Sequence, residues 1–385
     1  MISRALSRTL ADAKRSFLLL GPRQTGKSTL VSSLNPDLSI NLAYESTYLE
    51  FARNPRELEE RLSALPTAEK THTVFIDEVQ RLPSLLNTVQ ALLDAAPLRY
   101  RFWLTGSSAR KLRRGQANLL PGRIFTFQLG PVVSSEMQYQ LDTAQVLAHG
   151  TLPGILVEPD LYVKEKILSA YAATYLKEEV QAEALTRNME GFARFLSVCV
   201  QYAGQFLDLA KLAADAQIAR QSAVRYFEVL EDCLILQRLA PFAKSPRRRL
   251  VQHPRYYFFD PGVLNGLLGN FKVSADRIGN LFEHLVVTQV ASSALARDRR
   301  VELASYRTEH GAEVDLIMTI NGETIAIESK ASRNIGKNDL RGLASFAEYF
   351  GKPHRAMLFY LGTERRKIGP VEILPWQMGL KEIGL

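Results

Sequence analysis

The stretch Phe17–Thr29 reads FLLLGPRQTGKST, and it sets the fold of the first part of the chain. Its four leading apolar residues predict a buried strand, and the turn after them fits G-x-x-x-x-G-K-[ST] from Gly21 to Ser28. Glycines such as Gly21 and Gly26 let the backbone N–H groups of such a loop approach a phosphate closely. Lys27 is expected to reach the β- and γ-phosphates of ATP, and Ser28 to hold Mg²⁺.

The helix that begins at this loop is expected to point its N-terminus at the bound anion. Thr29 lies in its first turn and is included in the expected nucleotide-binding set. The alternative is a chance match in a glycine turn, which the preceding strand and the following helical run both disfavour.

Size and composition describe an ordinary globular chain. It has 385 residues, 46% hydrophobic and 23% charged, which predicts two or three domains. The net charge of +8 permits binding to nucleic acid without requiring it. Cys199 and Cys233 are the only cysteines, and their apolar context predicts buried thiols in a reducing compartment. No signal-peptide core or membrane-length apolar run is present, so we expect a cytoplasmic location.

Residues 1–130 alternate between strand and helix patterns. This alternation predicts an α/β fold with a parallel sheet covered on both faces. The further strands and helices expected in this part of the chain are, in order, Leu38–Leu42, Pro55–Leu65 (helix), Thr73–Ile76, Ser84–Ala95 (helix), Arg101–Leu104 and Ile124–Leu129.

An acidic pair, Asp77 and Glu78, ends one of these strands and predicts the second half of a nucleotide site. Asp77 is expected to bind Mg²⁺, and Glu78 to orient and deprotonate the attacking water. The alternative is an exposed acidic strand end. Thr105 ends the next strand and is expected to contact the γ-phosphate or the water, with Ser107 as a rival for that role.

Residues 99–123 carry seven Lys or Arg side chains and no acid. The cluster is either functional or a solvated basic face. Arg123 precedes the last strand, and in ring ATPases that position carries an arginine finger that stabilises transition-state charge. A finger acting in trans needs a neighbouring subunit, which suggests a homo-oligomer; the alternatives are that Arg123 acts in cis or does not act as a finger. The cluster consists of Arg99, Arg101, Arg110, Lys111, Arg113, Arg114 and Arg123.

These motifs together resemble the AAA-type P-loop ATPases. The chain looks most like the prokaryotic ATPases of this type that carry a conserved C-terminal domain of unknown function. The resemblance covers Gly21–Thr29, Val74–Glu78 with the Gln-Arg-Leu-Pro that follows, Leu104–Ser107 and Gly122-Arg123. It implies an ATPase domain, a winged helix and a nuclease-like C-terminal domain.

The middle of the chain is helical. Tyr162–Ala184 and Met189–Tyr202 have helical spacing, and packing or a lid-like role is the expected use of this part. Residues 205–260 resemble a winged helix-turn-helix. Asp208–Asp215 would be its first helix and Gln221–Cys233 its recognition helix. The wing strands would be Leu234–Ala240 and Arg255–Phe259, joined by a basic tip at 244–249 that suits phosphate contact.

A second candidate site lies in Glu313–Lys330, EVDLIMTINGETIAIESK. Asn-Gly at 321–322 predicts a two-residue hairpin turn. That register places Asp315 opposite Glu328, with Lys330 on the same face as Glu328. The other face, with Val314, Leu316, Met318, Ile320, Ile325 and Ile327, is expected to be a core face.

Two facing carboxylates are destabilising unless a cation binds between them. Carboxylate oxygens suit Mg²⁺ or Mn²⁺, so we expect a metal on Asp315 and Glu328. The metal would activate water, while Lys330 would orient that water or stabilise charge. The alternatives are an exposed Glu328–Lys330 salt bridge, or a Glu313–Lys330 pair, and neither accounts for the facing carboxylates.

The same residues resemble the PD-(D/E)xK nuclease pattern, with Asp315 as its aspartate and Glu328-x-Lys330 as its E-x-K. The resemblance implies a further carboxylate from a preceding helix, and Glu283 on Arg277–Leu295 fits, with a solvated edge position as the alternative. Val314 departs from the usual proline before the aspartate. His284 and His310 are interpreted as structural.

We therefore expect an ATP-hydrolysing protein coupled to a metal-dependent DNA nuclease. The alternative is an ATP-driven switch whose nuclease-like domain binds DNA or protein without cleavage. The expected fold is a P-loop parallel sheet, a helical and winged-helix region, and a mixed restriction-endonuclease-like domain. The expected domains are 1–150 (ATPase), 151–204 (helical linker or lid), 205–268 (winged helix-turn-helix) and 269–385 (nuclease-like).

Overall fold

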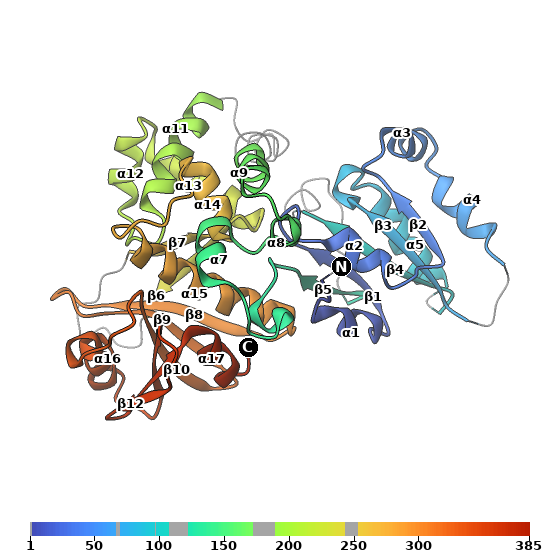
Figure 1. Cartoon of the computed structure of the whole chain (residues 1–385). Helices are drawn as coiled ribbons and strands as arrows, with labels where there is room; N and C mark the ends of the chain where they lie inside the picture. The colour runs from blue at the N-terminus through green and yellow to red at the C-terminus, as the bar shows by residue number, and fades with distance from the viewer. Residues whose placement is uncertain (1, 67–69, 97, 108–121, 172–188, 243–252) are drawn as a thin grey trace. The chain divides into compact units, whose positions relative to one another are not determined.

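The computed structural model describes residues 2–66, 70–96, 98–107, 122–171, 189–242 and 253–385 (Figure 1). These residues form two compact units. The first comprises Met1–Gly130 with two short segments, Asp232–Leu234 and Leu295–Asp298, and the second comprises the rest. Basic residues 110–114, the wing tip at 244–249 and the end of the predicted helix at 172–184 lie outside the described residues.

A parallel five-stranded sheet in the order β2-β3-β4-β1-β5 is the centre of the first unit. This confirms the α/β prediction. The strands are β1 (Ser16–Leu20), β2 (Leu38–Asn41), β3 (His72–Asp77), β4 (Tyr100–Gly106) and β5 (Ile124–Gln128). The helices are α1 (Leu6–Ala11), α2 (Lys27–Ser32), α3 (Glu45–Arg53), α4 (Glu57–Ser63) and α5 (Leu85–Ala95), with the 3-10 turn η1 (Val79–Arg81).

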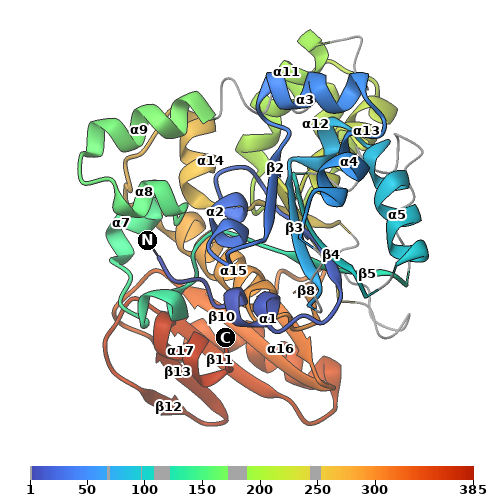
Figure 2. The same cartoon turned by 90° about the vertical axis from the view of Figure 1, so that its right-hand side faces the viewer.

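Strand β1 is buried along its whole length because both faces of this sheet are covered. Phe17 and Leu19 pack with α1 and α2, whereas Leu18 and Leu20 pack with α3, α4 and α5. Successive side chains of a strand point to opposite faces, so one apolar run supplies both cores. Figure 2 shows α2 and α5 on opposite sides of the sheet.

The second unit is built on a mixed eight-stranded sheet in the order β12-β13-β11-β10-β9-β8-β6-β7. The strands are β6 (Leu236–Pro241), β7 (Arg255–Phe258), β8 (Val301–Arg307), β9 (Glu313–Ile320), β10 (Glu323–Lys330), β11 (Arg355–Tyr360), β12 (Arg366–Ile368) and β13 (Val371–Pro375). Strands β6 and β7 form the antiparallel pair predicted for the wing, and β6 also pairs in parallel with β8. They therefore share a sheet with the predicted nuclease-like strands.

The first helices of this unit precede all of its strands along the chain, and the later helices lie between or after groups of strands (Figure 1). They are α7 (Thr143–His149), α8 (Pro153–Val157), α9 (Leu161–Ala170), α11 (Met189–Cys199), α12 (Leu209–Asp215), α13 (Arg220–Asp232), α14 (Pro261–Leu268), α15 (Ile278–Ala296), α16 (Arg341–Phe350) and α17 (Trp376–Glu382). The 3-10 turns are η2 (Ser134–Met137), η4 (Val200–Tyr202) and η5 (Lys337–Leu340). The four-domain division of the sequence stays a prediction, because the two units are defined by contacts between residues and do not test those domain boundaries. In the described parts of the chain, no helix has the length and apolarity needed to cross a membrane.

Helix α16 packs against strand β9 through a glycine. A Cβ atom at Gly342 would lie 1.7 Å from the carbonyl oxygen of Glu313. Val314 and Phe346 are fully buried in the same apolar cluster, so the helix has no room to move outward without opening that core. Only glycine permits this approach.

Gly342→Ala is expected to lower the free energy of unfolding of the second unit by about 2 kcal/mol or more, as overpacking against backbone does. Gly279→Ala in α15 is the matched control, because a Cβ there meets nothing within 4 Å. That change should be neutral or stabilise by up to about 1 kcal/mol through helix propensity. Urea unfolding measures both, and equal stability of the two variants would contradict the packing described.

Candidate functional site

The phosphate loop between β1 and α2 has the shape that its sequence predicts. Gly26 has φ 88° and Gln24 has φ 63°, both in the left-handed region, so the chain turns sharply into the helix. A Cβ atom at Gly21 would lie 2.3 Å from the carbonyl oxygen of Leu129, so this position requires glycine. Nζ of Lys27 donates to the carbonyl oxygens of Gly21 (2.8 Å) and of the next residue (2.9 Å), which holds the ammonium over the loop.

The hydroxyl of Ser28 and the carboxylate of Asp77 meet at the sheet edge next to this loop. Ser28 Oγ donates to Asp77 Oδ1 at 2.8 Å, and the hydroxyl of Thr105 donates to the same oxygen. Ser28 lies at the start of α2, Asp77 at the end of β3 and Thr105 near the end of β4. Because β3 and β4 are parallel, their carboxyl ends lie at the same edge of the sheet. A hydroxyl and a carboxylate oxygen are donors that suit Mg²⁺ beside nucleotide phosphates. The predicted metal-binding residues of this site are therefore brought together.

Glu78 sits in a strained backbone position at the end of β3. Its φ is 58°, which a non-glycine residue rarely adopts and which is common at functional sites. Its N–H donates to Thr105 Oγ1 at 3.2 Å, and its carboxylate accepts from the Gln80 amide. The same amide donates to Ser107 Oγ at 3.2 Å. Thr105 thus contacts Asp77, and Ser107 contacts Gln80. The two residues considered for the γ-phosphate role therefore belong to one hydrogen-bond network but have different partners in it.

Two contributors to this site were missed by the sequence reasoning. Gln80 was noted only as part of a motif, although its amide orients the Glu78 carboxylate. Arg4 is buried and donates to the carbonyl oxygens of Thr25 (2.6 Å) and Gly130 (2.9 Å), which fixes the loop from outside the motif. Thr29, predicted to bind nucleotide, is exposed in the first turn of α2.

Arg123 lies at the opposite edge of the same sheet. It precedes β5, whereas the phosphate loop follows β1, and these strands are parallel neighbours of about 16 Å length. Its guanidinium makes two hydrogen bonds with Asp94, of 2.6 and 3.0 Å. Arg123 therefore cannot act on the phosphate loop of its own chain, and a role on a neighbouring copy stays a prediction.

The hairpin of the second unit has the predicted turn and register. Asn321 (φ 51°) and Gly322 (φ 82°) both adopt the left-handed conformation of a type I′ turn. Strands β9 and β10 pair from Ile320 opposite Glu323 to Leu316 opposite Ile327. All six residues predicted for the core face are buried.

Asp315 lies where this regular pairing ends. Between Ala304 and Tyr306 of β8, the paired residues of β9 change from Ile317 to Val314, so β9 carries one extra residue there. Such a β-bulge re-aims a side chain. Asp315 Oδ2 accepts hydrogen bonds from the backbone N–H and the hydroxyl of Ser329, both 2.8 Å, in place of a further backbone pair. Direct pairing of Asp315 with Glu328 stays a prediction, but the charge of Asp315 acts on Glu328 and raises its pKa.

Glu328 and Lys330 are two residues apart on β10. Lys330 Nζ donates to Glu328 Oε1 at 2.6 Å. Oε2 of Glu328 is buried and accepts no hydrogen bond from the described residues. Burial, and then the charge of Asp315, raise the pKa of Glu328 well above its ordinary value. An unsatisfied buried carboxylate oxygen beside a second carboxylate is an electrostatic cost that a bound cation would remove.

Arg255 on β7 was not predicted to take part in this site. Its side chain is 5% exposed, donates a hydrogen bond to Glu283, and has Nη1 3.8 Å from Asp315 Oδ1. Nε donates to the carbonyl oxygen of Gly204 at 2.6 Å. The guanidinium carbon also lies 5.4 Å from the ring centre of Tyr257. A positive charge is thus built into the cluster of carboxylates.

Glu283 reaches this cluster from α15, as predicted, but its partners are Arg255 and the hydroxyl of Tyr257. Burial and then the nearby Asp315 raise the pKa of Glu283 to about 8, although Arg255 acts in the opposite direction. Glu283 is therefore protonated over most of the neutral range. Sequence reasoning found the carboxylate but could not find its partners, which lie on a strand interpreted as part of a wing.

No three His, Cys, Asp or Glu side chains among the described residues form a ready metal site. The donor set left for a cation in the second unit is therefore two carboxylates, Asp315 and Glu328. His284 is buried, with Nε2 2.6 Å from the carbonyl oxygen of Phe258, which agrees with a structural role.

Comparison with known proteins assigns the first part of the chain. Residues 13–138 match the family model described as AAA domain, so the chain contains an AAA-type ATPase domain. Residues 140–274 and 278–378 match two domains of unknown function, DUF8612 and DUF4143. The AAA match supports ATP binding with Mg²⁺, which the Ser28–Asp77 geometry suits.

Two relatives are uncharacterized proteins of Mycobacterium bovis and Mycobacterium tuberculosis. Each is 26% identical over 319 residues, which cover 81% of this chain and 69% of the relative. Among solved structures, a DNA polymerase III gamma subunit-related protein of Thermotoga maritima has 11% identity and a TM-score of 0.26, covering 60% of this chain and 98% of its own. A signal transduction ATPase with numerous domains from Pyrococcus horikoshii has 11% identity and a TM-score of 0.23, covering 76% and 45%. Both scores are too low to inform fold or function.

The raised pKa of Glu283 predicts how stability depends on pH. Between pH 4.5 and about 8 the unfolded state ionises this carboxyl while the folded state keeps it protonated. Unfolding therefore becomes easier as pH rises through this window. The groups that face it are Arg255 and Tyr257 from β7 and Asp315 and Glu313 from β9.

We expect wild type to lose about 3 kcal/mol more than Glu283→Gln between pH 5 and 8, at about 1.4 kcal/mol for each unit of pKa shift. Urea unfolding at several pH values measures the two slopes. The slope is the readout, because the variant also weakens the contact with Arg255. Parallel slopes would show that Glu283 is ionised in the folded protein.

Proposed function

We propose that this protein hydrolyses ATP in its first unit and cleaves DNA with a metal-dependent phosphodiesterase site in its second. The AAA-type domain supports the first half of this proposal. A single observation carries the second half. Oε2 of Glu328 is buried without a hydrogen-bond partner among the described residues, next to the carboxylate of Asp315 and two residues from Lys330.

In the ATPase unit, the chain's own residues divide the work. The loop N–H groups and Lys27 bind the phosphates, while Ser28 and Asp77 hold Mg²⁺, which neutralises phosphate charge when bound. Glu78 accepts a proton from the attacking water. Gln80 keeps the Glu78 carboxylate in place through its amide, so water attack is restricted to one direction.

In the second unit, Asp315 Oδ1 and Glu328 Oε2 are the oxygens available to hold Mg²⁺ or Mn²⁺, since the other oxygen of each accepts hydrogen bonds. The ion, when bound, neutralises a phosphodiester and activates water. Lys330 orients that water or stabilises the charge on the phosphate. Ser329 holds Asp315 in the rotamer that leaves Oδ1 exposed to the ion.

DNA is the proposed substrate because basic side chains suit its backbone. Helix α13, the proposed recognition helix, exposes Arg220, Gln221 and Arg225 in its first half. The N-terminal residues of a recognition helix are those that contact base edges in helix-turn-helix proteins. Glu228 on the same helix is exposed as well, so contact is proposed only for the first half.

A second candidate function is a switch that binds DNA or protein without cleavage. Arg255 favours it, because its guanidinium lies between Glu283 and Asp315 and supplies positive charge where an ion is proposed to bind. A fixed cation lowers the affinity of adjacent carboxylates for a second one. In this alternative, the cluster of carboxylates around Arg255 stabilises the second unit, and ATP hydrolysis is the only reaction that the protein catalyses.

The test incubates the full chain with plasmid and short linear DNA, with Mg²⁺ or Mn²⁺, in the presence and absence of ATP. Asp315→Asn should reduce cleavage by about a hundredfold, because it removes the charge of one of the two carboxylates proposed to hold the ion that activates water. Asparagine still accepts the Ser329 hydrogen bonds, so the hairpin is preserved.

Glu323→Gln is the matched control, an exposed carboxylate at the start of β10, the partner strand of the hairpin, and should cleave as wild type does. Intact DNA with wild type under every condition would reject the nuclease and favour the switch. Equal cleavage by Asp315→Asn would place the activity elsewhere in the sample.

A further inference from the structure

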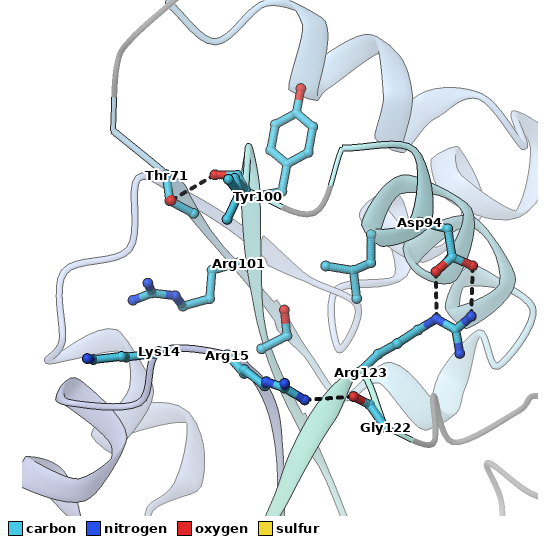
Figure 3. A pocket seen from close by; sticks show the side chains of 11 residues that line it. Lys14, Arg15, Thr71, Asp94, Tyr100, Arg101, Gly122 and Arg123 are labelled. Atoms are coloured by element: carbon cyan, nitrogen blue, oxygen red, sulfur yellow. Dashed lines mark hydrogen bonds and ion pairs between the residues drawn. The ribbon is translucent and has the colours of Figure 1, made fainter.

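A basic pocket of about 570 Å³ lies in the first unit, away from the nucleotide site (Figure 3). Four cationic side chains line it, with Asp94 as the acid among them. The cations are Lys14, Arg15, Arg101 and Arg123. We call this the strand-start pocket, because each of these cations lies within two residues of the first residue of a strand.

The position of the pocket follows from the parallel sheet. Lys14 and Arg15 precede β1, Arg101 is the second residue of β4, and Arg123 precedes β5. These strands are neighbours in the order β4-β1-β5, so the cations form a row along the edge opposite to the phosphate loop. At about 4.8 Å for each strand spacing, the row extends across about 10 Å.

Two of these cations have fixed positions. Arg15 donates to the carbonyl oxygen of Gly122 at 2.8 Å, and its guanidinium carbon lies 5.9 Å from the ring centre of Phe125. Arg123 is held by Asp94. Figure 3 shows Arg15 directed at Gly122 and Arg123 directed at Asp94, so both line the pocket with restrained side chains.

Lys14 and Arg101 are different. Among the described residues, neither makes an ion pair or a hydrogen bond through its charged group, and Figure 3 shows the two side chains extending to the same side of the pocket. Helix dipoles do not account for them. Lys14 lies beyond the end of α1 at Ala11, Arg101 lies farther beyond the end of α5 at Ala95, and dipole effects fade within the last turn.

We propose that the strand-start pocket binds the phosphodiester backbone of a nucleic acid strand. Lys14 and Arg101 contact phosphate directly, and Arg15 adds positive charge from a fixed position. A row of cations across about 10 Å suits consecutive phosphates of an extended chain better than one compact anion. The proposal shares its partner class with the proposed function but stands whether or not the second unit cleaves.

The experiment measures the affinity of the full chain for a labelled single strand and for its duplex by fluorescence anisotropy, from about 50 to 200 mM salt. EDTA is present and ATP is omitted, so that neither hydrolysis nor cleavage contributes. Lys14→Ala combined with Arg101→Ala should weaken binding about tenfold or more. The slope of log K against log salt should become shallower by about 1.4 for the single strand and about 1.8 for the duplex, which corresponds to two lost contacts.

The control combines Arg53→Ala with Arg56→Ala, which removes the same net charge from exposed positions that do not line the pocket. Its affinity should stay within about twofold of wild type, since exposed surface charge away from the pocket acts weakly at this salt. If both double variants lost the same affinity for nucleic acid, the loss would be explained by net charge alone, and the proposal would be overturned.

A second readout separates nucleic acid from nucleotide as the source of phosphate. ATP hydrolysis by the pocket variant is measured against protein concentration. A change there, with unchanged nucleic acid affinity, would assign the pocket to the nucleotide of a neighbouring copy and overturn the proposal. Failure of wild type to bind any nucleic acid would overturn it as well, whereas failure to cleave bears on the proposed function alone.

Discussion

The proposed nucleotide site of the first unit depends on the hydrogen bonds that the carboxylate of Asp77 accepts. One of its oxygens accepts hydrogen bonds from the hydroxyls of Ser28 and Thr105, so a helix and two strands meet at a single atom. Thr105 in turn accepts the N–H of Glu78, whose left-handed backbone places its carboxylate next to Gln80. The parallel sheet makes this possible, because it brings the ends of β3 and β4 to the edge where the phosphate loop begins. The geometry of hydrolysis is therefore set by the sheet.

The second unit also brings several carboxylates close together, but it lowers the cost of their repulsion in a different way. Asp77 lies at an edge next to a loop that binds phosphate, whereas Glu283 and Glu328 are mostly buried within the sheet and α15. Buried charges are tolerated only when they are paired or protonated. Lys330 pairs with Glu328, whereas the raised pKa of Glu283, about 8, keeps that carboxyl protonated near neutral pH, with Arg255 donating a hydrogen bond to it. One oxygen of Glu328 is left unsatisfied among the described residues, and this is the basis for proposing a metal there.

Much of this could be predicted from short-range patterns. The phosphate loop and the Asn-Gly turn are set by local backbone conformation, so Gly26 and Gly322 identify them from the sequence alone. The hairpin register follows from the turn and was confirmed as far as Leu316. What could not be predicted depends on contacts between distant parts of the chain. Arg255 lies 28 residues from Glu283, on a strand that the sequence pattern assigned to the wing of a winged helix. The β-bulge at Asp315 depends on β8, which was not predicted, and Asp94 gives no sign in sequence that it holds Arg123.

The central claim is that the Lys27, Ser28 and Asp77 constellation is a working site for ATP hydrolysis. The most direct measurement is phosphate release from ATP with Mg²⁺ by wild type, Lys27→Ala and Asp77→Asn, with Arg53→Ala as an exposed control and thermal unfolding as a check on folding. Both site variants are expected to remain folded and to lose at least about a hundredfold in turnover, because each removes a charge that acts on the transferred phosphate. Turnover equal to wild type in folded Lys27→Ala and Asp77→Asn would contradict the account.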